Sequence, residues 1–202
     1  MNTSNCLLSV LLLFAALSTV VNGQKKHVAK CNLWKGKCPP GWKSFARQPN
    51  VFICMRVFYA KTTYLEAQEV CRRNFNSRVH GIANMAEHLW VKKEAKRVLP
   101  SDRLYMWVGA RRKSYCYNTQ AKLADNDECK DKTQQFEWDD QLTTEPYFFS
   151  QWDQKTLAPN GLMVNGAPED CAVLIVHPSN FGVADDIECT GKAHGFVCGM
   201  TA

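Results

Sequence analysis

Apolar residues recur at helical spacing in two segments of the chain. The first, TTYLEAQEVCRRN at 62–74, offers Thr63 as an N-cap with Glu66 three residues later, the pattern of a capping box. The apolar positions that follow place Cys71 on one stripe of this helix. The second segment, NMAEHLWVKKEAKRVL at 84–99, has an apolar stripe and a lysine- and arginine-rich outer face. Both segments are therefore predicted to be amphipathic helices.

Elsewhere the apolar residues occur in short runs, rich in β-branched and aromatic side chains, that are typical of strands. They are NVFICMRVFY (50–59), LYMWVGA (104–110), QFEWDD (135–140), CAVLIV (171–176) and GFVC (195–198). Between Arg111 and Val173 the pattern contains few regular elements, and a connection of that length is usually functional or tied by disulfides. Two early helices, several short strands and one long loop predict an α+β domain.

The chain begins with an apolar stretch from Cys6 to Val21 that is too short to favour a membrane span. Val21 and Gly23 lie at positions −3 and −1 of a cleavage before Gln24, so residues 1–23 are predicted to be a secretory signal peptide. No later apolar run reaches about 18 residues, so no transmembrane segment is expected. We therefore expect a secreted, extracellular protein.

Cysteines are frequent in the chain that follows the predicted signal peptide. They occupy positions 31, 38, 54, 71, 116, 129, 171, 189 and 198. In an exported chain these residues predict disulfides, and the spacing contains no close C-x-x-C or H-x-x-x-H pairs that would indicate zinc. The odd count leaves one thiol without an internal partner, and eight cysteines can pair in about 105 ways.

The net charge of +6 hides an asymmetry along the chain. Residues 24–113 hold 20 Lys and Arg against 5 Asp and Glu (+15), whereas residues 114–202 hold 5 against 14 (−9). The two halves either attract each other within one fold, which we favour, or form a basic face for anionic glycans and an acidic face for a cation. The basic runs RRNFNSR (72–78) and RRK (111–113) are interpreted as solvated surface, with binding of sulfated glycans as the alternative.

A series of short motifs completes the description of the sequence. In order they are CPPGWKSF, FIC, YLEAQEVC, RVHGIANMAEHLWV, MWVGA, FEWDD, FFSQW, APN, PEDCAVLIV, ADDIEC and HGFVC. Their order and spacing resemble the C-type lectin-like domain family from about Cys38 to Gly199. The resemblance implies one such domain over residues 38–200, of the long form and similar to single-domain nematode members, after a basic N-terminal arm at 24–37.

The resemblance also implies which cysteines pair. The implied disulfides are Cys38–Cys54, Cys71–Cys198, Cys116–Cys129 and Cys171–Cys189. Cys31 remains in the basic arm, outside the matched domain, and is predicted either to link two chains or to be capped by a small thiol. A dimer joined through Cys31 is accordingly one expected assembly.

In calcium-binding members of the family, sugar binds to a calcium ion held by the protein. The corresponding positions are Ala158, Asn160, Glu169, Asp185 and Asp186. Ala158 has no side-chain oxygen, so the resemblance implies Asn160, Glu169, Asp185 and Asp186 as calcium ligands and Asn160, Glu169 and Asp185 as carbohydrate contacts. Calcium takes about six to eight oxygen ligands, so four side chains predict a weak site.

Other departures from the family pattern occur at the same loop. Ala184 stands where the family has a tryptophan, and the segment between Asn160 and Glu169 is longer than usual. In calcium-binding relatives the peptide bond before the loop proline is cis, and a bound metal could select that isomer at Ala158–Pro159, because cis costs only about 0.5–1 kcal/mol relative to trans.

The sequence shows no nucleophile–base pair, phosphate-binding glycine loop or paired acid and base carboxylates, so we do not expect an enzyme. The expected partners are glycans or glycoproteins rather than nucleic acid. The predicted function is that of a secreted carbohydrate-binding protein with weak calcium dependence. The alternative is a calcium-independent protein-binding or matrix module, since one fold serves many functions.

Overall fold

The computed structural model describes residues 37–98, 103–117, 126–177 and 182–202. The predicted signal peptide, Cys31 and nearly all of the basic arm lie outside these residues. The elements in chain order are β1 (Lys43–Arg47), β2 (Val51–Phe58), α2 (Tyr64–Phe75), β3 (Arg78–Val79), α3 (Met85–Val98), β4 (Leu104–Arg112), η1 (Ser114–Cys116), α5 (Asp127–Lys130), β5 (Phe136–Trp138), η2 (Tyr147–Ser150), β6 (Met163–Val164), β7 (Ala167–Pro168), β8 (Cys171–Val176), β9 (Val183–Ile187) and β10 (Gly195–Thr201).

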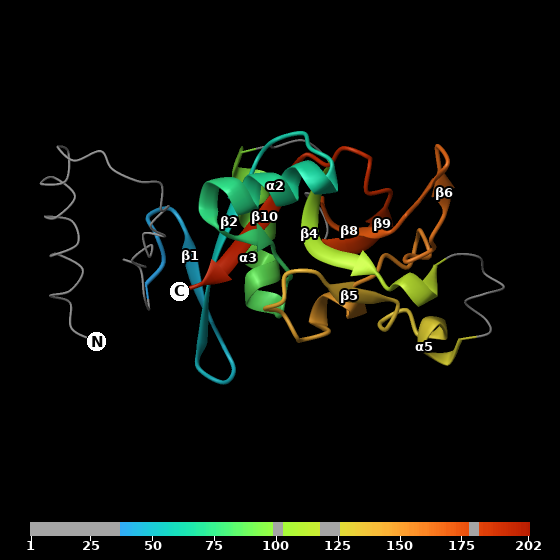
Figure 1. Cartoon of the computed structure of the whole chain (residues 1–202), viewed down its shortest axis with the longest axis horizontal. Coiled ribbons are helices and arrows are strands. Elements are labelled where there is room, and N and C mark those ends of the chain that lie inside the picture. The colour runs from blue at the N-terminus through green and yellow to red at the C-terminus, as the bar shows by residue number, and fades with distance from the viewer. Residues whose placement is uncertain (1–36, 99–102, 118–125, 178–181) are drawn as a thin grey trace, which may run out of the picture. The chain divides into compact units, whose positions relative to one another are not determined.

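A mixed sheet forms the centre of the domain (Figure 1). Its main path has the order β1-β2-β10-β4-β8-β9, with β3 joined to β10 and β5 joined to β4. β10 and β4 run parallel, whereas the other neighbours on this path are antiparallel. Because the last strand lies between β2 and β4, the end of the chain completes the sheet. This combination of helices and sheet confirms the α+β architecture predicted from the sequence.

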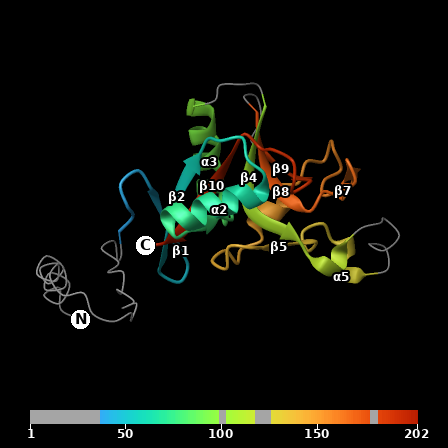
Figure 2. The same ribbon diagram turned by 45° about the horizontal axis from the view of Figure 1, so that its top comes forward.

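The two long helices cover opposite faces of the sheet, as the alternation of side chains along β4 shows. Met106 and Val108 belong to one apolar cluster that includes Val91 of α3. Trp107 belongs to a second cluster that includes Ala67 of α2. Successive residues of a strand point to opposite faces, so α3 packs against one face and α2 against the other. Figure 2 shows α2 crossing in front of β10.

Helix α2 starts where the sequence predicts it. The Thr63 hydroxyl accepts a hydrogen bond from the Glu66 N–H (3.3 Å), and the Glu66 carboxylate accepts one from the Thr63 N–H (2.8 Å). This capping box satisfies two donors at the start of the helix and confirms the predicted cap. The helix ends at Asn76, which adopts the left-handed conformation. None of the helices in the described ranges is long and apolar enough to cross a membrane.

Four disulfides join distant parts of the domain. They are Cys38–Cys54, Cys71–Cys198, Cys116–Cys129 and Cys171–Cys189, the same pairs that the resemblance implies. Cys71–Cys198 links α2 to β10 across a sequence separation of 127, and a chain-entropy estimate gives such a loop about 4–5 kcal/mol of stabilisation. Cys171–Cys189 fixes the start of β8 to the segment that follows β9.

Two buried polar pairs stabilise the turn between β3 and α3. Arg47 lies 2.8 Å from Glu87, and the His80 Nδ1 atom lies 2.8 Å from Asp140, with all four side chains almost fully buried. Asp140 also accepts a hydrogen bond from the Thr143 hydroxyl (2.6 Å). Burial by itself would raise the pKa of Asp140, but the hydrogen bond and charge of His80, together with Thr143, outweigh it and hold the pKa below its ordinary value.

We predict that Asp140→Asn lowers the free energy of unfolding by about 3–5 kcal/mol near pH 7, because the change breaks a buried pair. A carboxylate with a lowered native pKa stabilises the fold above its ordinary pKa of 3.8, and this contribution is lost as the pH falls below that value. The difference between wild type and variant should therefore shrink below about pH 4. Urea unfolding at pH 7 and pH 3 measures it, with the half-buried Asp139→Asn as a control.

Candidate functional site

The candidate site is built on the long loop, residues 151–170, which runs from η2 to β8 and carries the small hairpin of β6 and β7. The loop stands out beyond the end of β8 and β9 (Figures 1 and 2). The Glu169 N–H donates to the Leu162 carbonyl (3.0 Å), which closes the base of the hairpin. The Ala158–Pro159 peptide bond is cis, the isomer that the resemblance associates with calcium-binding members of the family.

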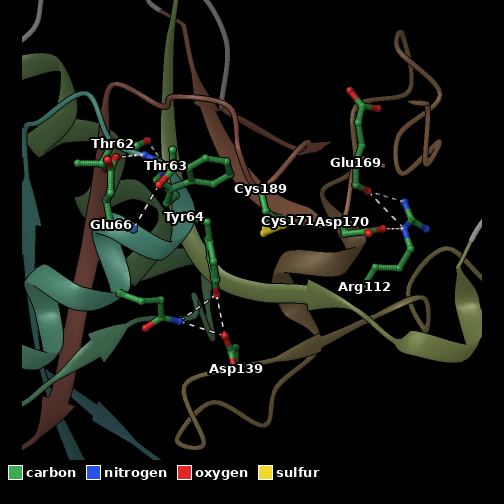
Figure 3. The surroundings of a disulfide bond; sticks show 12 residues. Thr62, Thr63, Tyr64, Glu66, Arg112, Asp139, Glu169, Asp170, Cys171 and Cys189 are labelled. Atoms are coloured by element: carbon green, nitrogen blue, oxygen red, sulfur yellow. Dashed lines mark hydrogen bonds and ion pairs between the residues drawn. A yellow bond between two sulfur atoms is a disulfide. The ribbon is translucent and has the colours of Figure 1, made fainter. Parts of the chain in front are cut away.

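A buried arginine, Arg112, lies beneath this loop. It is the last residue of β4, and its side chain is only 1% exposed. Its Nη2 atom lies 2.6 Å from the Asp186 carboxylate and its Nε atom 3.3 Å from the Asp170 carboxylate. The guanidinium also donates to the Glu169 carbonyl (3.2 Å) and to the Gln135 side-chain carbonyl (2.6 Å). Figure 3 shows Arg112 directed at Asp170 and the Glu169 backbone. Arg112 therefore joins β4 to the end of the loop and to β9.

The Asp186 carboxylate is fully engaged within the protein. Besides Arg112, it accepts hydrogen bonds from the N–H groups of Asn160 (3.0 Å) and Gly161 (2.8 Å). Gly161 has a φ of +61°, and a Cβ at this position would lie 3.2 Å from the Arg112 Nη2 atom. The backbone conformation favours glycine here, and a Cβ would also crowd the guanidinium. Asp186 fixes the turn that follows Pro159 to β9.

A second cation, Lys132, also contacts the loop. Its ammonium donates to the Ala158 carbonyl (2.9 Å) and to the Leu157 carbonyl. Lys132 comes from the segment between α5 and β5, so the loop is held from that side as well. The Ala158 methyl group is fully buried in the larger apolar cluster. Position 158 is therefore a core position whose carbonyl, rather than its side chain, contacts a cation.

Glu169 and Asp185 are the acidic residues of the site whose carboxylates Arg112 does not contact. Burial, followed by the charges of Asp186 and Asp185, raises the pKa of Glu169 to about 7. Burial, followed by the charge of Asp186, raises the pKa of Asp185 to about 6. One oxygen of the Glu169 carboxylate is buried without a hydrogen-bond partner among the described residues. In Figure 3 this carboxylate points away from Arg112. The two groups therefore repel each other and Asp186.

The calcium set that the resemblance implies does not fit this arrangement. Asn160, Glu169, Asp185 and Asp186 lie on the loop and on β9, but Asp186 is bound to Arg112, and the Asn160 side-chain oxygen accepts from the Leu162 N–H (3.0 Å). Within the ranges that the structure describes, no three acidic, histidine or cysteine side chains are placed to hold one metal ion. The positive charge at the site is instead supplied by the protein itself.

The sequence interpretation missed the residues that contribute this charge. The interpretation of RRK at 111–113 as solvated surface is wrong for Arg112, because its side chain is buried. The guanidinium carbon lies 4.7 Å from the centre of the Phe136 ring. The available signal was the strand period. Adjacent residues of a strand point to opposite faces of the sheet, so Arg111 and Arg112 cannot both lie on one solvated face. No comparable pattern marked Lys132, since its contacts are to backbone carbonyls 25 and 26 residues away.

We predict that Arg112→Met lowers the free energy of unfolding by about 3–5 kcal/mol, because Asp170 and Asp186 would stay buried without their counter-charge. Arg111→Met is the matched control, since it removes the same charge from the next, exposed residue and should change stability by no more than about 0.5 kcal/mol. Urea unfolding of the two variants measures the difference. Equal losses would show that Arg112 has no special role in the fold.

We predict that Glu169→Gln has a pH-dependent effect on stability. An acid whose native pKa is raised stabilises the fold below its ordinary pKa of 4.5, and this contribution is lost as the pH rises through about 7. The variant should therefore gain about 1 kcal/mol relative to wild type between pH 5 and pH 8, after allowance for solvent screening. Thermal unfolding in the presence of a chelator measures the gain, and a constant difference across this range would contradict it.

Comparisons with known proteins agree with this fold. The model of the family described as C-type lectin domain-containing protein 141/158 matches residues 44–202. The C-type mannose receptor 2 of Rattus norvegicus is 25% identical over 170 residues, which are 81% of this chain and 9% of the receptor. The chain thus spans only about a tenth of the curated relatives that it matches.

Solved structures with the same fold have lower sequence identity. The C-type lectin CEL-I from Cucumaria echinata is 21% identical, with a TM-score of 0.54 over 80% of this chain and 96% of CEL-I. Human lithostathine is 18% identical, with a TM-score of 0.55 over 89% of this chain and all of that structure. These likenesses establish the fold, and the family match covers most of the chain. The chain therefore belongs to the C-type lectin domain-containing protein 141/158 family and has a C-type lectin-like fold.

Proposed function

We propose that the chain is a secreted carbohydrate-binding protein whose long loop binds glycans without requiring calcium. The observation that supports this function is the buried Arg112 guanidinium, 2.6 Å from Asp186, one of the residues that the resemblance implies as calcium ligands. Because this guanidinium is part of the protein, it holds the loop at any calcium concentration. The four disulfides suit an oxidising, extracellular environment.

The exposed surface of the loop suits a sugar because it combines apolar and polar groups. Leu157, Leu162 and Met163 are 68%, 57% and 57% exposed. The half-buried Asn160 lies between them in the chain. Its amide oxygen accepts from the Leu162 N–H (3.0 Å) and its nitrogen donates to the Thr156 carbonyl (3.3 Å), which leaves one amide N–H for a ligand. A sugar ring has C–H faces as well as hydroxyl groups, so apolar side chains beside an amide complement both. The names of several similar proteins, which refer to mannose or to carbohydrate recognition, also support this class of ligand.

Protein binding is the second candidate function, and the same exposed side chains favour it. Three large apolar residues close together on one loop are typical of a protein interaction surface. A partner of this kind would also be bound without calcium. Weak calcium binding by Glu169 and Asp185, the carboxylates that Arg112 leaves unpaired, stays a prediction that the same experiment tests.

We predict that the disulfide-bonded protein binds the same glycans on an array in millimolar calcium and in excess chelator. Leu162→Asp should reduce this binding at least about tenfold, because it places a charge in the apolar part of the loop surface. Leu89→Asp is the control, since Leu89 is an exposed leucine of α3, away from the loop.

Three outcomes would change the proposal. Binding of glycans in calcium but not in chelator would show that calcium takes part and would support Glu169 and Asp185 as ligands. Equal effects of the two aspartate variants would place the glycan elsewhere on the domain. An array without any bound glycan, together with a folded protein, would favour the protein-binding function.

A further inference from the structure

A cleft of about 790 Å³ lies against α2, on the face of the sheet opposite to the apolar cluster that contains Val108 and Ala110. Its walls come from α2, the turn after it, β3, the end of β4 and the segment after β9. A smaller hollow of about 210 Å³ shares Arg111 and Asp139 with it. The volume is within the range of about 300–1,000 Å³ that is typical of ligand sites.

Three arginines from the two basic runs of the sequence meet in this cleft. Arg72 and Arg78 come from RRNFNSR and Arg111 comes from RRK, and all three side chains line the cleft. Arg111 precedes Arg112 on β4, so the alternation of the strand sends one guanidinium into the acidic site and the other to the α2 face. The fold thus collects positive charge from segments about 40 residues apart in sequence.

Two of these arginines have no carboxylate partner among the residues that the structure describes. Arg72 pairs with Glu69 (2.9 Å), an exposed contact that contributes little. Arg78 donates only to the Asp139 backbone carbonyl (3.4 Å), and neither Arg78 nor Arg111 forms an ion pair with any residue that the structure describes. Both are exposed to solvent at the cleft. Their donors remain available to an anionic ligand.

The floor of the cleft is a fixed polar network. The Tyr64 hydroxyl donates to the Asp139 carboxylate (3.2 Å), and the Gln68 amide donates to the same carboxylate (3.0 Å). The Gln68 carbonyl in turn accepts from the Val79 N–H (3.2 Å), which ties the floor to β3. Figure 3 shows Tyr64 pointing down to Asp139. With its charge already hydrogen-bonded, Asp139 opposes an anion less than a free carboxylate would.

We propose that this cleft binds a sulfated oligosaccharide, with Arg78 and Arg111 as the principal contacts. A guanidinium presents paired N–H donors that match the oxygens of a sulfate group. The cleft has the size of an oligosaccharide segment and a polar floor for sugar hydroxyls. Nucleic acid fits less well, because the aromatic side chain of the lining, Tyr64, is buried and offers no free face on which a base could stack.

The cleft is independent of the long loop. Apart from Cys189 and Thr190, its lining comes from α2 with its N-cap Thr63, the residues after α2, Arg111 and Asp139, and it contains no residue of 151–170. Ligand binding there requires neither calcium nor the exposed surface of the long loop. A failure of the loop as a glycan site would leave the cleft proposal unaffected.

The test measures the affinity of the disulfide-bonded protein for a heparin-derived octasaccharide by titration calorimetry in chelator. We expect binding that weakens as salt rises and is lost with the chemically desulfated octasaccharide. Arg78→Gln/Arg111→Gln should weaken binding at least about tenfold, the equivalent of one charge-assisted hydrogen bond. Thr190→Glu, which adds a negative charge at the exposed rim of the cleft, should also weaken binding of the octasaccharide.

The controls separate this cleft from general surface charge. Arg97→Gln removes an exposed arginine of α3 that pairs with Glu94, and it should change the affinity less than about twofold. Equal losses in Arg97→Gln and in the double variant would overturn the proposal, as would equal affinity for the desulfated sugar. Tighter binding of an oligonucleotide of matched charge would assign the cleft to nucleic acid instead. Thermal unfolding of each variant verifies that the fold is retained.

Discussion

The ion pair between Arg112 and Asp186 determines how the long loop is held. It connects the end of β4 to β9, and the same guanidinium reaches Asp170 and the Glu169 carbonyl at the end of the loop. The Asp186 carboxylate extends the connection to the N–H groups that follow Pro159. A buried pair of this kind is not by itself strong evidence of stability, since desolvation offsets much of the attraction. The main effect of the pair is to define the position of the loop relative to β4 and β9.

The two adjacent arginines of β4 illustrate how one strand supplies two different surfaces. The even-numbered residues Met106, Val108 and Ala110 face the α3 side, and Arg112 continues that series into the acidic site. Trp107 faces α2, and Arg111 continues that series into the cleft. The register with β8 shifts between these two residues, where the strand leaves the regular ladder. Because side chains alternate along β4, Arg112 is a buried counter-charge, whereas its neighbour Arg111 is exposed at the proposed anion-binding cleft.

The sequence was sufficient for the parts of the fold that depend on local patterns. The capping box at Thr63 and Glu66, the helix after it and the strand runs of the core all appear in the structure, because each depends on residues that are close in the chain. The disulfide pairs were available only through the family resemblance. The strand period indicates that Arg112 turns away from the face of Arg111, but the partners of Arg112 and Lys132 could not be assigned from a pattern, since they are 23 to 74 residues away. For the same reason, the meeting of Arg78 and Arg111 in one cleft appears only in the structure.

The charge asymmetry of the sequence and the missing ligand at position 158 have one explanation. Arg112 belongs to the basic half of the chain, and Asp170 and Asp186 belong to the acidic half, so the halves attract each other within one fold, as favoured from the sequence. Beside the Arg112–Asp186 pair, position 158 carries no side-chain oxygen, and the buried Ala158 methyl group packs in the core instead. Ala184 is likewise a buried member of that cluster, beside Trp152. We therefore expect that a side-chain oxygen restored at 158 alone does not recreate a calcium site, because Arg112 would still bind Asp186.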